Sequence, residues 1–332
     1  MSDADATLRV VKPALRAGLL PLWRDRETIQ IGVDPRRAVA LTGIGAAAGL
    51  IGLLDGSRDR DQLVAAAAQV GIPVPLAERL LALLTDAGQL IDYPARMLRG
   101  LAADRRAGLL PELATASIAR QDADGGAAVL AQRSAALVQI DGEGRIPATI
   151  AEVLAASGVR VVAGPIESGT VGPGSIRPSP IRPGPVTTSP RAGRPGLIVL
   201  AGRLPDPAGR LPDIPHLAVS AREAIGMVGP LVRPGSSACL RCLDLARAER
   251  DPAWPLILAQ LARRQAEPVA CGAALAAAVA AQAAAQVLLF IDCPAAAVPA
   301  QDATLELVLP GWQWRRRGWP PHPACTCRAG DR

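Results

Sequence analysis

The sequence predicts an α/β protein in which a small winged-helix domain is followed by a larger domain of alternating strands and helices. Short strands precede three helical segments near the N-terminus, and apolar strand-like runs alternate with helices further on. Two cysteine pairs, one in the middle of the chain and one near its end, have the spacing of metal ligands. The 332 residues suffice for two domains, which we place at residues 1–95 and 132–332, with a helical connector at 96–131.

The N-terminal domain is predicted from short apolar runs bounded by turn residues. Three strands are expected at residues 19–24, 28–33 and 38–41. Three helices are expected at residues 44–54, 59–70 and 75–85. Pro75 suits the first turn of the third helix, Gly88 ends that helix, and residues 90–91 start a wing.

A winged helix can bind DNA or another partner, and its third helix helps to decide between these uses. That helix carries a single arginine, Arg79, so it lacks the basic face expected of a major-groove reader. Beside it we expect a short edge strand of Ala38, Val39, Ala40 and Leu41. Unpaired amides on such an edge can accept an extended peptide as an added strand. The edge can equally be short and bare, and the residues alone leave both interpretations open.

The larger domain begins with a β-α-β pattern. Two strands and the helix between them are expected at residues 136–141, 159–163 and 147–156. The turn before the helix contains Gly142 and Gly144, at the position where a nucleotide phosphate binds in dinucleotide folds. Pro147 replaces the third glycine of that fingerprint and removes an amide donor, so the match to a nucleotide site is weak.

The rest of this domain follows the same alternation. Residues 164–196 are rich in proline and glycine and are expected to form an irregular crossover. Four more apolar runs are expected as strands, at residues 197–201, 217–220, 227–232 and 304–309. The alanine-rich run at 272–291 contains two glutamines, so we interpret it as a buried helix rather than a membrane span. The start of the chain has no signal-peptide pattern, and a cytoplasmic protein without membrane contact is expected.

The net charge of +6 and the isoelectric point near 9.5 would suit a nucleic-acid partner, but the distribution of charge does not. Lys12 is the only lysine, and arginines are scattered among acidic residues. Arg315, Arg316 and Arg317 form a basic run that is typical of a solvated strand or hairpin edge. We therefore predict no nucleic-acid partner.

Four cysteines form the clearest chemical constellation in the chain. Cys239 and Cys242 make a C-x-x-C, and Cys325 and Cys327 make a C-x-C. Together they can supply the four thiolates of a structural, tetrahedral Zn²⁺ site. A disulfide or unpaired thiols are the alternatives, although disulfides are uncommon in a cytosolic protein. His322 could support or replace a ligand, but four cysteines already fill the site and leave no position for a catalytic water.

Several of these stretches resemble one protein family. The run VGPLVRPGSSACLRCLDLARAERDPAWPLILAQL and the closing HPACTC resemble the ThiF-like (E1-like) proteins of azole-forming peptide pathways, the TOMM class of RiPP biosynthesis. These proteins are cyclodehydratase-associated and bind the leader of a precursor peptide. The segments WRDRETIQIGVDP, LLDGSRDRDQL and LLALLTDAGQLID resemble the family's peptide-recognition domain, which is a winged helix. The resemblance covers both ends and the middle of the chain.

The resemblance implies an E1/ThiF-like Rossmann-type domain with a structural zinc on the four cysteines. It also implies that a leader peptide lies between the third strand and the third helix, at Ala38 to Leu41 and at Glu78, Arg79 and Ala82. Heterocycle formation in the family belongs to a YcaO-type cyclodehydratase, which is thus an expected partner. E1-like domains also pair as homodimers, and the alanine-rich helix is a candidate for that contact.

Adenylating members of the E1 class carry G-x-G-G-x-G, a D-x-D after the second strand, and basic residues that hold the phosphates. Here the turn reads GEGRIP, the second strand VRVVAGPIE lacks D-x-D, and Lys12 lies outside the domain. We therefore expect Gly142 and Gly144 to form a vestigial nucleotide loop, with neither ATP use nor catalytic residues. The leading hypothesis is a non-catalytic adaptor that presents a leader peptide to a cyclodehydratase. The alternatives are an ATP-dependent adenylyltransferase acting on a peptide or protein carboxylate, and an orphan scaffold with an unrelated partner.

Overall fold

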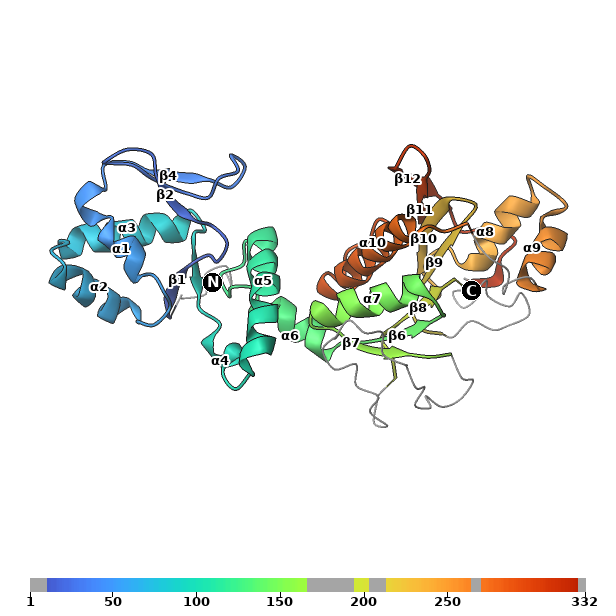
Figure 1. The fold of residues 1–332 in the computed structure, drawn as a ribbon, viewed down its shortest axis with the longest axis horizontal. Coiled ribbons are helices and arrows are strands. Elements are labelled where there is room, and N and C mark those ends of the chain that lie inside the picture. Colours follow the sequence, from blue (N-terminus) through green and yellow to red (C-terminus); the bar gives the residue numbers. More distant parts are fainter. Residues whose placement is uncertain (1–10, 166–193, 203–212, 264–269, 328–332) are drawn as a thin grey trace, which may run out of the picture. The chain divides into compact units, whose positions relative to one another are not determined.

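Residues 11–165, 194–202, 213–263 and 270–327 are described by the computed structural model of the chain. They form a mixed α/β fold that divides into two compact units, Met1–Ala131 and Gln132–Arg332 (Figure 1). Each unit has its own cluster of buried apolar side chains. The crossover expected at residues 164–196 falls almost wholly outside the described residues.

The first unit contains the three predicted strands as an antiparallel sheet. They are β2 (Pro21–Trp23), β3 (Ile29–Ile31) and β4 (Val39–Leu41), in the order β2-β3-β4. The register pairs Pro21 with Ile31 across the first hairpin and Ile31 with Val39 across the second pair. Ile29 and Ile31 are buried because alternate residues of the central strand face the core. Strand β4 is therefore an edge, as expected.

The predicted helices follow, with one difference. The segment expected at 44–54 divides into a short 3₁₀ helix, η1 (Gly45–Ala47), and α1 (Gly49–Leu53). The other two are α2 (Arg60–Gln69) and α3 (Val74–Asp86). Helix α3 buries Ala77, Leu80, Leu81 and Leu84, and this stripe packs in one cluster with Leu41 of β4. Strand β4 and α3 thus share a core.

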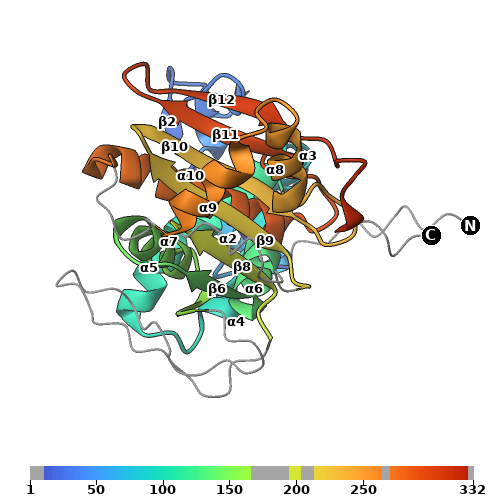
Figure 2. The same ribbon diagram turned by 90° about the vertical axis from the view of Figure 1, so that its right-hand side faces the viewer.

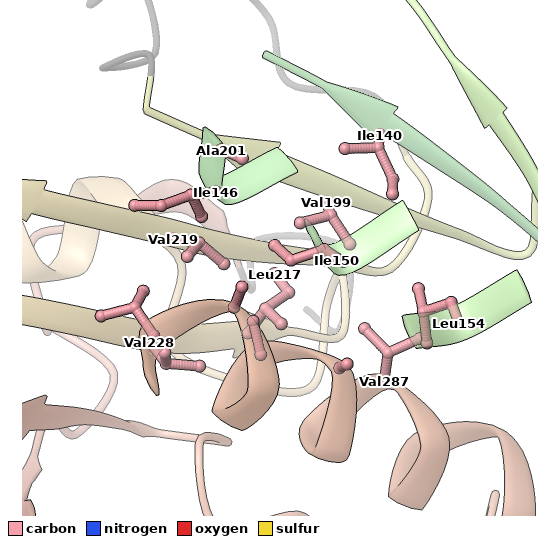
Figure 3. Packing of buried hydrophobic residues seen from close by; sticks show 14 of the residues in the cluster. Ile140, Ile146, Ile150, Leu154, Val199, Ala201, Leu217, Val219, Val228 and Val287 are labelled. Carbon is pink, nitrogen blue, oxygen red and sulfur yellow. The ribbon is translucent and has the colours of Figure 1, made fainter. Parts of the chain in front are cut away.

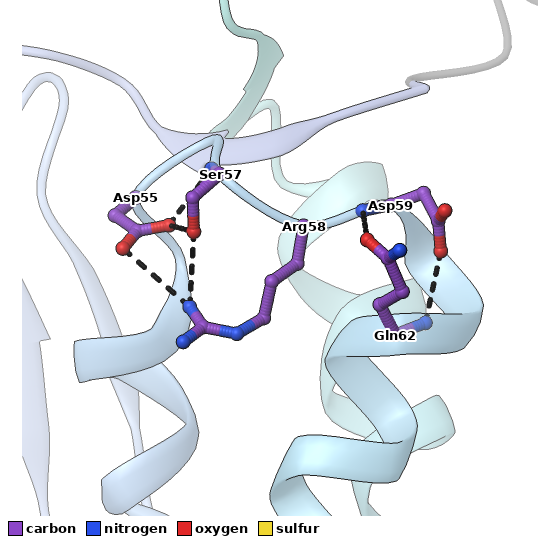
Figure 4. A network of polar contacts seen from close by, with 5 residues as sticks. All are labelled: Asp55, Ser57, Arg58, Asp59 and Gln62. Atoms are coloured by element: carbon purple, nitrogen blue, oxygen red, sulfur yellow. Dashed lines mark hydrogen bonds and ion pairs between the residues drawn. The ribbon is translucent and has the colours of Figure 1, made fainter.

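Helix α2 begins with a capping box. The Asp59 carboxylate accepts a hydrogen bond from the Gln62 amide at 2.9 Å, and the Asp59 amide donates to Gln62 Oε1 at 3.1 Å (Figure 4). Just before it, Asp55 accepts hydrogen bonds from the Ser57 amide and hydroxyl and forms an ion pair with Arg58. These contacts satisfy the first free amides of the helix and fix where it starts.

One strand of the first unit has no signal in the sequence. Strand β1 (Pro13–Leu15) pairs antiparallel with β5 (Leu90–Asp92), where a wing was expected. A three-residue strand that begins with proline is too short to show alternation, so only its partner reveals it. The connector region then forms α4 (Ala95–Leu98), α5 (Ala103–Arg120) and α6 (Ala127–Ala135).

Arg16, directly after β1, is the largest polar side chain in the core of this unit and is 1 % exposed. Its guanidinium donates to the carbonyls of Gly88, Ser117 and Asp122 at 2.9, 2.6 and 3.0 Å, and to Ser117 Oγ at 2.7 Å. Burial lowers the pKa of Arg16, while the negative charges of Asp122 and Asp124 raise it. Since these partners follow α3, lie in α5 and follow α5, one cation joins three segments to β1.

The second unit is built on a seven-stranded mixed sheet. Its strands are β6 (Leu137–Asp141), β7 (Arg160–Ala163), β8 (Leu197–Ala201), β9 (His216–Arg222), β10 (Ile225–Val232), β11 (Ala303–Val308) and β12 (Gln313–Gly318). Their order is β12-β11-β10-β9-β8-β6-β7. Strands β6, β7, β8 and β9 are mutually parallel, and β9 to β12 pair antiparallel. All six apolar strands expected in this domain are present. Strand β12 covers the basic run of Arg315, Arg316 and Arg317, which was expected as a solvated strand or hairpin edge.

Helices cover both faces of this sheet. Helices α7 (Arg145–Ala156) and α10 (Ala273–Asp292) pack on one face, where the apolar side chains of α7 meet Val199, Leu217 and Val287 (Figure 3). Leu305 and Leu307 of β11 belong to that core, so the side chain of Glu306 between them faces the other side of the sheet. On that opposite face lie α8 (Leu240–Ala248) and, beside it, α9 (Trp254–Arg263) (Figure 2).

Helix α10 confirms the helix expected in the alanine-rich run. By length and composition it could cross a membrane, and among the described residues no other helix meets that test. Half of its apolar stretch is buried within the unit, and the buried side packs against β9, β10 and α7. A core helix of this kind passes the same test, so length and apolarity alone do not make α10 a membrane span.

We predict that Arg16→Met destabilises the protein by about 2–4 kcal/mol. Methionine fills a similar volume but leaves the buried carbonyl groups without a donor. Urea unfolding followed by circular dichroism measures the change. The matched control is Arg36→Met, whose arginine side chain is 85 % exposed and pairs with Asp34; it should change stability by less than about 0.5 kcal/mol. Equal effects of the two substitutions would show that Arg16 does not tie the segments together.

Candidate functional site

The four cysteines of the two predicted pairs come together in the second unit. Cys239 precedes the first turn of α8 and Cys242 lies within it, while Cys325 and Cys327 follow β12. The Cys239 Sγ lies 3.8 Å from Cys242 Sγ and 3.6 Å from Cys325 Sγ, and Cys242 Sγ lies 3.5 Å from Cys327 Sγ. All four sulfur atoms lie within 4.8 Å of one another, so the cluster could hold a metal ion.

The geometry fits a tetrahedral zinc better than a disulfide. A Zn–S distance of about 2.3 Å places the four sulfurs about 3.8 Å apart, close to the separations found here. A disulfide needs about 2.05 Å, and the cysteines form no disulfide in the described part of the chain. A metal in this site would hold the two cysteine pairs together, and it would have no position left for a substrate or water.

The electrostatics of the cluster favour a bound cation. Burial raises the pKa of the Cys239 thiol to about 11 and also raises that of Cys327. Burial would raise the pKa of Cys242 too, but backbone hydrogen bonds from His322 and Cys239 lower it. Four thiolates this close repel one another, and a divalent ion between them removes that repulsion.

His322 holds the loop that carries Cys325 and Cys327 through two hydrogen bonds. Its Nε2 lies 2.9 Å from Glu249 Oε1, and its Nδ1 accepts a hydrogen bond from the Ala324 amide at 3.2 Å. Because Nδ1 accepts a hydrogen bond, Nε2 carries the hydrogen atom and donates a hydrogen bond to the Glu249 carboxylate. Among the described residues, the group that could hold a metal ion consists of the four cysteines and does not include His322. These contacts are compatible with the supporting role that was expected of His322 beside the cysteines.

A buried tryptophan joins the cluster to the sheet. Trp319 follows β12, is 2 % exposed, and packs with Cys242 and Leu243 of α8. Its indole N–H donates to Thr304 Oγ1 of β11 at 3.0 Å. The guanidinium of Arg247 lies 5.3 Å from the ring centroid and that of Arg317 4.4 Å. This packing fixes the end of β12 beside the cysteines.

The residues expected at a peptide-binding edge lie in the first unit. Ala38 and Val39 are half-buried, Ala40 is exposed, and Leu41 is buried in the core. On α3, the exposed positions include Glu78, Arg79 and Ala82, which lie on the helix face opposite the buried stripe. The structure thus leaves the edge of β4 and part of α3 open in the same unit.

The hydrogen-bond pattern shows which amide of β4 is free. The amides of Arg24 and Gly32 donate to the carbonyls of Thr28 and Leu20, so even-numbered residues of β3 face β2. Odd-numbered residues of β3 therefore face β4, and they pair with Val39 and Leu41. Consequently the N–H and C=O of Ala40 point away from the sheet.

Leu83 of α3 is not among the residues expected at the peptide-binding edge. It is 46 % exposed, although large apolar side chains on a helix are mostly buried. It lies four residues after Arg79 and thus on the same face of the helix. The spacing from Arg79 is the signal in the sequence that places Leu83 on the exposed face, because α3 contains leucines that are not part of its buried stripe.

The glycine turn of the second unit connects β6 to α7. Gly142 has φ of +149°, and a side chain there would meet the carbonyl oxygen of Ala201 at 2.0 Å, so glycine is required for packing. Gly144 has φ of +97° and precedes α7 without a side-chain cap. Pro147 lacks the amide that a phosphate would use, and Glu143 brings a negative charge to the turn. These features serve the fold and do not favour an anion.

One of the two histidines of the chain is buried in the large sheet. His216 at the start of β9 is 3 % exposed, and its Nδ1 lies 2.9 Å from the Ile214 carbonyl. Burial lowers the pKa of His216, and Nε2 has no hydrogen-bond partner among the described residues.

Comparison with solved structures identifies proteins of the same fold. The heterocyclase TruD matches 96% of this chain with a TM-score of 0.60 and 14% identity, and a heterocyclase in complex with substrate and cofactor matches with a TM-score of 0.62. MccB of E. coli, with AMPCPP and MccA, matches 95% of this chain and 99% of its own, with a TM-score of 0.55 and 14% identity. No family model matches the sequence, and no curated protein matches it.

The lengths of these neighbours differ. This chain spans about two fifths of the heterocyclases, 42% and 39% of their chains, and nearly all of MccB. At 14% identity the likeness establishes the fold alone. MccB also matches as a microcin C7 biosynthetic enzyme in complex with N-formylated MccA, with a TM-score of 0.53.

We predict about one zinc per chain in the purified protein, and loss of that zinc in Cys242→Ser. Losing the metal should cost at least about 3 kcal/mol, which lowers Tm by about 6–12 °C for a unit of this size. Metal analysis and calorimetry measure the two effects. Cys293→Ser, a cysteine outside the cluster, is the control and should keep the zinc. A metal-free protein with unchanged Tm would refute the zinc site.

Proposed function

We propose that this protein is a zinc-stabilised, non-catalytic adaptor that binds the leader of a ribosomal precursor peptide and presents it to a YcaO-type cyclodehydratase. In this proposal the first unit is a winged-helix peptide-recognition domain and the second an E1/ThiF-like domain. The observation that carries it is the free edge of β4, a strand that shares one core with α3. A cytoplasmic setting suits both the thiolate cluster and a ribosomal substrate.

Binding at this edge would follow the physics of strand addition. The outward N–H and C=O of Ala40 offer main-chain hydrogen bonds to an extended peptide, which supply affinity for any sequence. The small side chain of Ala40 lets a second strand approach closely. Leu83 and Arg79 then offer one apolar and one charged contact to alternate side chains of the peptide, which supply specificity.

The solved neighbours support a peptide as the ligand. One is a heterocyclase with substrate and cofactor, and another is MccB with its peptide MccA. Proteins of this fold thus act on or hold peptides. The fold alone leaves open whether a given member also carries out chemistry, so the residues of the second unit bear on that question.

An ATP-dependent adenylyltransferase is the second candidate. The observation in its favour is the match to MccB over nearly the full length of both chains, including a structure of MccB with ATP. Against it stand the acidic turn at Asp141 and Glu143, the proline at position 147, and the location of Lys12 in the other unit. A nucleotide triphosphate needs cations and amides, and this turn offers one arginine, Arg145, beside two carboxylates.

For the adaptor, we predict saturable micromolar binding of a labelled leader peptide, encoded beside this gene, to the full chain. Ala40→Pro removes the outward amide and Leu83→Asp places a charge on the apolar contact, so each should weaken binding at least about tenfold. Fluorescence anisotropy measures the affinity. The matched control is Leu22→Asp on the opposite edge strand, where the leucine is 43 % exposed. Absence of binding by every neighbouring candidate peptide would sink the proposal.

For the adenylyltransferase, we predict no pyrophosphate exchange with ATP and any of these peptides. The comparison is with Gly144→Val, in which a branched side chain at positive φ distorts the turn. Wild type and variant should give the same background signal. Exchange that the substitution abolishes would establish the enzyme and overturn the adaptor.

A further inference from the structure

Strand β12 forms a free edge of the large sheet. It is the last strand in the order, and all six of its residues, Gln313–Gly318, are exposed. Its register with β11 is regular from Ala303 paired with Gly318 to Val308 paired with Gln313. Within the described residues, no strand pairs with its outer side. An unprotected edge of this length is a template for another strand.

The ladder shows which backbone groups are available. The Trp319 amide donates to the Asp302 carbonyl at 2.8 Å, so odd-numbered residues of β12 bond to β11. The N–H groups of Trp314, Arg316 and Gly318 therefore point outward from the sheet. Three outward amides on a regular strand are the donors that strand addition requires.

The side chains of β12 are basic and aromatic. Arg315, Arg316 and Arg317 follow one another, Trp314 is 38 % exposed, and Trp312 just before the strand is 47 % exposed. Across the ladder, Glu306 stands opposite Arg315. The Arg316 guanidinium donates to the carbonyls of Pro299 and Gln301, which carry no net charge. The edge thus keeps an excess of positive charge.

The charges are distributed over both faces of the sheet. Because side chains alternate along a strand, Arg315 and Arg317 lie on one face while Arg316 and Trp314 lie on the other. A strand added alongside β12 also presents side chains to both faces, so it meets all of these groups. A nucleic-acid backbone that approaches one face would reach only part of them.

The edge is also held rigidly. Trp319 at its end is buried against α8 and the cysteine cluster, and its ring lies under the guanidinium of Arg317. Holding β12 in a fixed strand conformation lowers the entropy cost of binding. Trp319 thus packs between the end of β12 and the cysteine cluster.

We propose that the outer edge of β12 binds an extended, acidic segment of a partner protein as an eighth strand of the sheet. Opposite charge selects this occupant, because acidic side chains directly across from arginines stabilise a strand pair. A second copy of this chain would place arginine against arginine, which is destabilising. The site lies in the other unit from β4, and the inference is independent of leader-peptide binding there.

The test uses the full chain and a fluorescein-labelled peptide of alternating glutamate and valine. Two further probes are the same peptide with all of its backbone amides N-methylated, which leaves no N–H donor on either edge, and a lysine–valine peptide. We expect saturable binding of the acidic probe and at least a tenfold loss for each of the others. Equal binding of the N-methylated probe would overturn strand addition and leave charge attraction alone.

Protein variants locate the site. Trp314→Pro removes an outward amide at an edge position where proline is tolerated, and we expect at least a fivefold loss of affinity; Trp314→Ala keeps the amide and should lose less. Arg315→Gln should also weaken binding at least fivefold. Arg105→Gln, an exposed arginine of α5 in the first unit, is the control for net charge and should have no effect. Unchanged binding by all β12 variants would refute the site.

Two other occupants give different results. A self-associating edge would show a concentration-dependent dimer in analytical ultracentrifugation that Trp314→Pro abolishes. A nucleic-acid site would bind a labelled single-stranded oligonucleotide more tightly than the acidic peptide, with the same loss in Arg315→Gln. Either result overturns the acidic-segment proposal. Circular dichroism and Tm of each variant establish that it is folded.

Discussion

The closure of the chain onto itself by four cysteines is the constraint on which the second unit depends. Cys325 and Cys327 come from a loop with little regular structure, and their sulfurs lie within 4.8 Å of the pair on α8. That loop follows β12 and Trp319, so the contact fixes the last strand of the sheet as well. A tetrahedral ion bound by the four sulfurs would hold this short loop in place. Such an ion would have no open coordination position, so its contribution would be to structure.

The first unit solves a similar problem with a single buried cation. Arg16 adds side-chain hydrogen bonds from the end of β1 to Gly88, just before its partner strand β5, and to Ser117 and Asp122, which lie in and after α5. A buried guanidinium is costly unless its donors are satisfied, and here three carbonyls and a hydroxyl satisfy them. Each unit thus has one polar centre that joins distant segments and an apolar core that supplies most of the burial. Neither centre leaves a site for chemistry.

The backbone is left unpaired at the edge strands of the sheets. The two edges, β4 and β12, both present unpaired amides, but their side chains differ. Strand β4 is short and flanked by small and apolar groups, whereas β12 is longer and carries three arginines. In the two proposals, main-chain hydrogen bonds would give either edge affinity for an extended peptide, and the side chains would decide which peptide binds. The glycine turn, filled by the backbone of β8 at Gly142, contributes to packing between the strands.

Local patterns in the sequence determined most elements of this protein. The capping box of Asp59 and Gln62, the leucine stripe of α3 and the apolar runs of the large sheet depend on neighbours within a few residues, and they were predictable. The cysteine spacing determined the ligand set, because the chemistry of four thiols has few other uses. Tertiary structure alone decided the pairing of β1 with β5, the burial of Arg16 and the partner of His322. Each of these depends on contacts between residues far apart in the chain, and no local period encodes such contacts.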